Sequence, residues 1–444
     1  MEPTHTDRSI HFIHDLKWEA LAADLQHQAK RCLMDALGAL IAGAETPPAR
    51  IMANIAERQF GGTEATILVG GAKTSAGGAV LANGFAANAL DIDDGYRLIK
   101  GHPGACVLPV ILTAAEVTPS CSGAEFLTAL IIGYELGIRA GLIRHARSET
   151  YHCSGTWGAI GGAAAAGRIM GLDRSRLRHA LGAAEHHAPF SPMMKGIDTP
   201  SMGKDSIGWG AMVAMLSVLM AREGFTGIEP IFSDTPEPGW IEGLGNDWQI
   251  FHLYFKPYAA CRWAQPAVDG ALKIKAEAGL QASDISEIRI RSFKEACALI
   301  TRPPTNTEEA QYNIAFPVAA ALIDDEVGPH QVLPPRIFDS DLKSLLLKIR
   351  TEVVQEYNEA FPVKTYAEVV IRTHEGETIS SGRMEPRWEA PSTLPSDKEL
   401  EEKFCRLVSP ILGESRCGEL VRMLWDFEGE PRAGILIDCC HYPD

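Results

Sequence analysis

The sequence predicts a mainly α-helical protein in which a large helical domain is joined to a smaller α+β domain. Three observations predict this fold: helical periodicity over the first two thirds of the chain, strand-like alternation in the part that follows, and helical periodicity again near the end. The length of 444 residues also favours more than one domain, because a single hydrophobic core rarely grows that large.

Residues 1–268 are expected to form most of the helical domain. Apolar and small residues recur at three- and four-residue spacing in four long segments, residues 28–44, 123–143, 155–172 and 206–225. Glycine costs about 1 kcal/mol at a helical site, so its abundance here predicts helices that approach one another closely enough to offset that cost.

Residues 269–396 are expected to form the α+β domain. Residues 285–293 alternate between apolar and polar, and residues 366–383 read as a hairpin with its turn near Gly376. Helical patterns cover residues 308–323 and 339–353. A connector rich in proline and serine then leads to a helix capped near Ser396, and residues 397–444 are expected to rejoin the helical domain.

Composition and charge exclude several classes of partner. The net charge of −16, without a run of lysine and arginine, argues against nucleic acid and anionic membranes. The ten cysteines form no CxxC motif, and the first twenty residues lack the apolar core of a signal peptide. The apolar stretch at residues 155–167 is too short to cross a bilayer, so the sequence predicts a cytoplasmic protein without a membrane partner.

One stretch, residues 89–116, contains a combination of charged side chains that a purely structural segment rarely needs. Within about fourteen residues it holds three carboxylates, two cations and one histidine before it turns apolar: Asp91, Asp93, Asp94, Arg97, Lys100 and His102. Two interpretations remain open: the cations form ordinary surface pairs with the acids, or the acids orient the basic groups in a pocket, as carboxylates orient a catalytic imidazole.

Further candidates lie close to predicted helix starts or turns. His152 and Lys204 each precede a helix rich in small residues, and Tyr258, Arg262 and Gln265 surround a turn. Helix starts attract anions because their N–H groups are free. A cationic site in an acidic protein suggests a small polyanionic substrate, with the planar fork of Arg262 holding a carboxylate.

The sequence predicts no metal site and no organic cofactor. No set of Cys, His, Asp and Glu has convincing ligand spacing. Residues 69–75 lack the Gly-Lys-Ser/Thr of a phosphate loop, and the acidic run at residues 91–95 departs from a calcium loop. The cations themselves are then expected to stabilise negative charge that develops on a substrate.

Several long stretches, in order along nearly the whole chain, resemble the MmgE/PrpD family: "ALDIDDGYRLIKGHPGACVLPVILTAAE", "GYELGIR", "HCSGTWGAIGGAAAAGRIMGL", "KDSIGWGAM", "REGFTG", "KPYAACRWAQPAVDG" and "EEAQYNIAFPVAAAL". The resemblance implies a discontinuous helical domain with an inserted α+β domain, a homodimer, and a site in the cleft between domains. It also implies action on small di- or tricarboxylates without an organic cofactor, by 2-methylcitrate dehydration, cis-aconitate decarboxylation or iminodisuccinate epimerisation. Asp91, His102, His152 and Lys204 occupy positions similar to the family's cleft residues.

Three departures shape the expected reaction. Gly95 stands where decarboxylase-like members carry Thr, Gln265 where many members carry His, and Phe316 where the decarboxylase type shows Tyr. We therefore expect an epimerase acting on an amino- or imino-dicarboxylate such as iminodisuccinate, with His102 and Lys204 as acid and base. The alternatives are a hydro-lyase similar to 2-methylcitrate dehydratase, and a noncatalytic carboxylate-binding protein.

Overall fold

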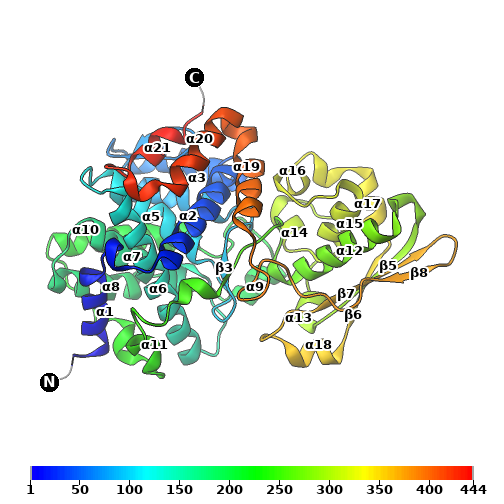
Figure 1. Cartoon of the computed structure of the whole chain (residues 1–444), viewed down its shortest axis with the longest axis horizontal. Helices are drawn as coiled ribbons and strands as arrows, with labels where there is room; N and C mark the ends of the chain where they lie inside the picture. Colours follow the sequence, from blue (N-terminus) through cyan, green and yellow to red (C-terminus); the bar gives the residue numbers. More distant parts are fainter. Residues whose placement is uncertain (1–2, 443–444) are drawn as a thin grey trace.

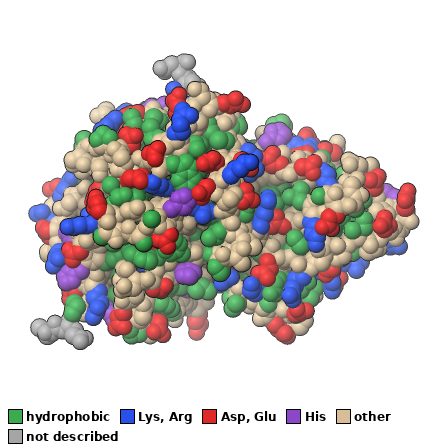
Figure 2. Space-filling view, in the orientation of Figure 1, with side chains coloured by type: hydrophobic (Ala, Val, Ile, Leu, Met, Phe, Trp, Pro, Cys, Tyr) green, Lys and Arg blue, Asp and Glu red, His purple; other side chains and the backbone are tan. Residues whose placement is uncertain are grey.

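The chain forms two lobes of unequal size. The computed structural model describes residues 3–442, and Figure 1 shows a large helical lobe beside a smaller lobe that contains the main sheet. Helices dominate and strands are few, which confirms the mainly α fold with an α+β part. Figure 2 shows acidic and basic side chains interspersed over the visible face of both lobes.

The helical lobe is built from the first part of the chain, and its helices are α1 (His5–Asp15), α2 (Ala23–Gly43), α3 (Pro47–Phe60), α4 (Ala76–Asn88), α5 (Pro103–Glu116), α6 (Gly123–Arg147), α7 (Gly155–Ile169), α8 (Arg174–His187), α9 (Met193–Asp198), α10 (Ile207–Arg222) and α11 (Gly239–Glu242). Short strands β1 (Ala65–Thr66) and β2 (Lys73–Thr74) pair with each other, and β3 (Gly95–Tyr96) pairs with β4 (Leu253–Tyr254).

Helices α6 and α7 form the centre of this lobe. They pack so closely that a Cβ atom added to Gly161 would lie 2.6 Å from the carbonyl oxygen of Gly133, which explains the small residues on these faces. By length and composition α6 is able to cross a membrane, but its most apolar window is entirely buried inside the protein. It is therefore a core helix, with α5 and α10 also packed on α7.

The smaller lobe has a four-stranded sheet in the order β6-β5-β7-β8, in which only the β5 and β6 pair is parallel. Helix α12 packs on β7 of the sheet, and α15 packs against α12. The elements are α12 (Gln265–Ala278), β5 (Ile285–Ser292), α13 (Lys294–Cys297), α14 (Thr307–Gln311), α15 (Ala315–Asp324), α16 (Pro329–Val332), α17 (Ser340–Leu346), β6 (Ile349–Val353), α18 (Gln355–Ala360), β7 (Ala367–Thr373) and β8 (Thr378–Ser380).

Two sequence predictions in this lobe have different outcomes. The predicted hairpin is confirmed by β7 and β8, with Gly376 in the left-handed region at a φ of 91° in the turn between them. The helix predicted over residues 339–353 is wrong in its second half, where β6 pairs in parallel with β5. Pairing with a distant strand overrides the local helical pattern there.

The end of the chain returns to the helical lobe through α19 (Asp397–Leu412), α20 (Glu414–Trp425) and α21 (Ile435–Cys439). Ser396 and Glu399 form a capping box at the start of α19, which packs along α2. From α19, the buried Lys403 Nζ contacts Asp35 Oδ1 at 2.5 Å and donates to the carbonyl of Ile92 at 2.7 Å. The last helices therefore brace the turn that follows α4.

Candidate active site

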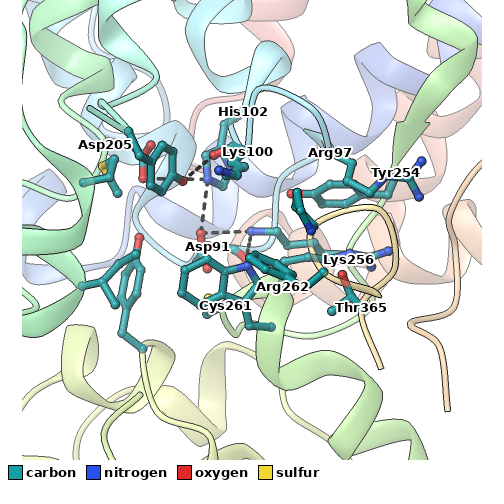
Figure 3. A pocket seen from close by; sticks show the side chains of 17 residues that line it. Asp91, Arg97, Lys100, His102, Asp205, Tyr254, Lys256, Cys261, Arg262 and Thr365 are labelled. Atoms are coloured by element: carbon teal, nitrogen blue, oxygen red, sulfur yellow. Dashed lines mark hydrogen bonds and ion pairs between the residues drawn. The ribbon is translucent and has the colours of Figure 1, made fainter. Parts of the chain in front are cut away.

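A cavity lies where the two lobes meet, and it encloses about 630 Å³ of empty space, its open mouth included. Figure 3 shows side chains from both lobes pointing into it. The helical lobe supplies most of the polar groups, whereas loops around α14 and α18 close the other side. The lining residues are Asp91, Arg97, Lys100, His102, Tyr151, Met193, Ile197, Asp205, Tyr254, Lys256, Cys261, Arg262, Trp263, Tyr312, Phe361, Pro362 and Thr365.

His102 lies at the start of α5, and one nitrogen of its ring is bound by a carboxylate. Its Nδ1 lies 2.9 Å from Asp93 Oδ2, and the side-chain amide of Asn88 donates to Asp93 Oδ1 at 2.9 Å. Burial works against ionisation of Asp93, but the His102 charge outweighs it and lowers the pKa of Asp93 to about 2. Nδ1 thus carries the proton shared with Asp93, and Nε2 is left toward the cavity.

Two further carboxylates face Nε2 of His102. Asp91 Oδ1 lies 3.6 Å away and Asp205 Oδ2 3.9 Å away. Ser154 Oγ donates to Asp205 Oδ1 at 2.8 Å, which ties this acid to the start of α7. Burial disfavours the imidazolium, but the carboxylate of Asp93 outweighs it, and the pKa of His102 is raised above its usual value. We call Asp91, Asp93, His102 and Asp205 the histidine wall.

Lys256 forms a buried ion pair with Asp91. Its Nζ lies 3.0 Å from Asp91 Oδ1 and donates to the backbone carbonyl of Asp91, also at 3.0 Å. Burial opposes both charges, but each charge favours the other, so the pKa of Lys256 is raised and that of Asp91 is lowered. Asp91 has a φ of 53°, in the left-handed region, so this backbone is held in an unusual conformation. Lys256 therefore brings a fixed positive charge to the cavity.

The opposite wall carries two arginines. Arg97 Nη1 lies 2.9 Å from Glu389 Oε1, and Arg262 Nη2 contacts Glu389 Oε2. The guanidinium of Arg262 also stacks on the ring of Tyr254, 4.2 Å from its centroid. We call Arg97, Tyr254, Arg262 and Glu389 the arginine wall. Between the walls, Lys100 Nζ lies 4.8 Å from the ring centroid of Tyr151, and burial lowers the pKa of Lys100.

Five of the nine residues predicted from sequence line the cavity together: Asp91, Arg97, Lys100, His102 and Arg262. Asp94, from the same stretch, accepts hydrogen bonds from Tyr134 and Gly104 on the far side of the turn, and burial raises its pKa to about 7. Of the acids in this stretch, Asp93 therefore contacts a basic group that lines the cavity, His102, whereas Asp94 does not.

Lys204 lies behind the turn, outside the lining residues. Its Nζ donates to the carbonyl of Asn88 at 2.6 Å and to Gln311 Oε1 at 2.7 Å, and burial lowers its pKa. These bonds join the end of α4 to the α+β lobe. The lysines that line the cavity are Lys100 and Lys256.

The remaining three predicted residues also lie outside the lining. His152 stacks on His145 with ring centroids 4.2 Å apart, and burial lowers its pKa to about 4. Tyr258 donates its hydroxyl proton to Asp269 at 2.7 Å. The amide of Gln265 donates to the carbonyls of Tyr258 and Ala260 and so shapes the turn that presents Arg262.

The structure shows the surroundings of two positions that depart from the family pattern, Gly95 and Phe316. A Cβ atom added to Gly95 would lie 2.2 Å from Cζ of Tyr254, so the tyrosine ring fills the space that a threonine would need. Phe316 is buried in the smaller lobe, whereas Tyr312 reaches the cavity. The missing tyrosine at position 316 therefore removes no hydroxyl from the cavity lining.

Sequence reasoning missed Lys256, Asp205, Tyr151, Tyr254 and Tyr312 as lining residues. Lys256 carried a signal, because it is a charged residue among apolar and aromatic neighbours in the same short stretch as Arg262. Asp205 directly follows Lys204, and their roles became distinguishable only from the direction in which each side chain points.

Asp91, Asp93 and His102 also form a group whose ligand atoms lie within 4.8 Å of one another, close enough to hold a cation. These atoms already have partners: Asp93 binds His102 and Asn88, and the ammonium of Lys256 occupies one side of Asp91. The arrangement suits charge compensation within the protein, and the expected independence from metal stays a prediction.

Comparison with known proteins identifies the family. The MmgE/PrpD N-terminal domain matches residues 9–250, and the MmgE/PrpD C-terminal domain matches residues 258–426. The cis-aconitate decarboxylase of Aspergillus terreus is 24% identical over 456 residues, covering 94% of this chain and 91% of its own length. The human cis-aconitate decarboxylase is 25% identical over 454 residues, covering 96% and 92%. The chain belongs to the MmgE/PrpD family.

Proposed function

We propose that the protein is a lyase that acts on a small polycarboxylate, with His102 as the group that transfers a proton at the carbon next to a carboxylate. The observation that carries this proposal is the pairing of His102 with Asp93, which leaves Nε2 facing a cavity lined by Lys256, Arg97 and Arg262. The relatives named above are lyases, which supports the class but leaves the substrate of this chain open.

The chemistry follows from the charges. When a carbon next to a carboxylate loses CO₂ or a proton, negative charge spreads onto that carboxylate, and Lys256 and the arginines are placed to stabilise it. Asp93 raises the pKa of His102 above its usual value and so favours the imidazolium, whose Nε2 is able to deliver a proton to that carbon. Asp93 holds the ring and compensates the charge of the imidazolium.

Epimerisation is the finer alternative that the sequence favoured. It requires two proton-transfer groups on opposite faces of one carbon, and the expected pair was His102 with Lys204. Lys204 is engaged by backbone carbonyls outside the lining, and Lys256, which does line the cavity, is held as an ammonium by Asp91. One proton-transfer group, His102, in a cavity whose other walls carry Lys256, Arg97 and Arg262 supports a lyase over an epimerase.

The test is to incubate the enzyme in D₂O with cis-aconitate, 2-methylcitrate, malate and iminodisuccinate and to follow each by NMR. A lyase releases CO₂ or water from one of them and leaves deuterium at one carbon of a decarboxylated product. Exchange of deuterium without loss of a group would identify an epimerase and would overturn the proposal. Binding without any exchange or elimination would identify a noncatalytic binding protein.

A further inference from the structure

Glu389, a member of the arginine wall, lies on the connector that leads from the α+β lobe back to α19. Its two carboxylate oxygens bind one guanidinium each, Oε1 at 2.9 Å from Arg97 and Oε2 in contact with Arg262. The chain therefore supplies its own carboxylate to the two groups that are best suited to bind a carboxylate of the substrate.

The backbone positions this carboxylate. Glu389 forms an antiparallel bridge with Tyr254, and the N–H of Phe255 donates to the carbonyl of Trp388 at 2.9 Å. Because β4 pairs in turn with β3, the connector, Tyr254 and Gly95 lie side by side. Trp388 has a φ of 66°, which is rare for a bulky residue and often marks a constrained functional position. The place of Glu389 is thus built into the fold.

The charge of Glu389 matters because cationic side chains outnumber carboxylates in the cavity lining. Its lining has four cationic side chains, Arg97, Lys100, Lys256 and Arg262, against the carboxylates Asp91 and Asp205. Glu389 is 16% exposed, and its carboxylate lies between two guanidiniums that are 38% and 10% exposed. A charge held so close to both arginines lowers the positive potential that an additional anionic group of a ligand would meet.

We infer that Glu389 is a specificity-determining residue that limits how many carboxylates the cavity accepts, so that a dicarboxylate is preferred over a tricarboxylate. This inference rests on the proposed function, in which the cavity binds a small polycarboxylate. This role of Glu389 differs from merely orienting the two arginines. Loss of an orienting residue weakens the binding of carboxylates, whereas loss of a negative charge that repels an additional carboxylate strengthens it.

The experiment measures binding of succinate and tricarballylate by isothermal titration calorimetry. These saturated acids differ by one carboxylate arm and lack the hydroxyl group and double bond that a lyase needs, so binding is read without turnover. Glu389→Gln and Glu389→Ala both remove the charge, and the alanine variant leaves the backbone pairing with Tyr254 in place. The control is Glu385→Gln on the same connector, where the exposed Glu385 pairs with Lys364 at 2.7 Å.

The expected result is that both Glu389 variants bind tricarballylate roughly tenfold or more tightly relative to succinate than the wild type does, whereas Glu385→Gln leaves the ratio unchanged. An unchanged ratio, or weaker binding of both acids, would overturn the inference and leave the proposed function standing. Failure of both acids to bind the wild type and every variant would contradict the carboxylate class itself, and the inference with it. Melting temperatures measured alongside report whether each variant is folded.

Discussion

The two walls of the cavity differ in how deeply their charged side chains are buried. On the histidine wall, Asp93 is 0% exposed, Asp91 and Asp205 are 2% exposed, and His102 is 6% exposed. On the arginine wall, the side chain of Arg97 is 38% exposed, that of Glu389 is 16% exposed and that of Arg262 is 10% exposed. A group that transfers a proton must be held in one position. Groups that bind a substrate must be accessible, because the substrate replaces the water and ions around them. Under the proposed function, the difference supports a catalytic role for the histidine wall and substrate recognition by the arginine wall.

The largest effect is expected at His102. His102→Ala removes the proton-transfer group and should lower kcat by about 10²–10⁴-fold, while succinate binding changes little. Steady-state kinetics on the substrate identified by NMR, together with calorimetry, measure the two effects. The control is His186→Ala, on the exposed side of α8. Activity of the His102 variant within about threefold of wild type would remove the catalytic role from the histidine wall.

The next effect is expected at Asp93. Asp93→Asn should lower kcat roughly 10- to 100-fold, because the ring of His102 loses the partner that orients it. The raised pKa of His102 depends on this carboxylate, so where an imidazolium is needed, activity falls as pH rises through that pKa. The variant should therefore lose activity at a lower pH than the wild type. A pH profile of kcat with the same midpoint in both proteins would contradict the orienting role.

A smaller effect is expected on the arginine wall. Arg262→Lys keeps the charge but loses the planar fork and its stacking on Tyr254, so KM should rise roughly tenfold with kcat nearly unchanged. Arg350→Lys, at an exposed arginine of β6 far from the cavity, is the matched control. A fall in kcat at constant KM would place Arg262 with the catalytic groups and would break the division between the walls.

The smallest effect is expected at the contact between Gly95 and Tyr254. Gly95→Thr forces the new side chain against the tyrosine ring and should destabilise the fold by about 1–3 kcal/mol. Adding Tyr254→Ser makes room, so the double variant should be more stable than the sum of the two single changes predicts. Chemical denaturation measures the three free energies, and strict additivity would show that the two residues do not compete for the same space.

Much of the fold was predictable because its signals are local. Helices α6 and α7 were predictable from apolar and small residues that recur every three or four positions, and the start of α19 was predictable from its capping residue, Ser396. Strand β6 was missed because its pairing partner, β5, lies far away in the sequence. Strand identity there is decided by the sheet and not by the residues themselves.

In the site, too, contacts between residues close in sequence were predictable, and contacts between distant residues were not. His102 and its acids lie within one short stretch, so their association was visible in the sequence. The pairs of Asp91 with Lys256 and of Arg97 with Glu389 join residues that only the tertiary fold brings together. The direction of a side chain is equally hidden, which is why Lys204 was expected in the cavity while its ammonium group binds the carbonyl of Asn88 behind it.

The most direct test of the central claim is ¹⁵N NMR of the histidines across a pH titration, with His102 assigned by comparison with the His102→Ala variant. We expect His102 to titrate above the usual pKa of about 6.5, with its neutral form protonated on Nδ1, and Asp93→Asn to lower the titration midpoint. A midpoint at or below the usual value, or a neutral form protonated on Nε2, would contradict the claim that Asp93 prepares His102 to transfer a proton from Nε2.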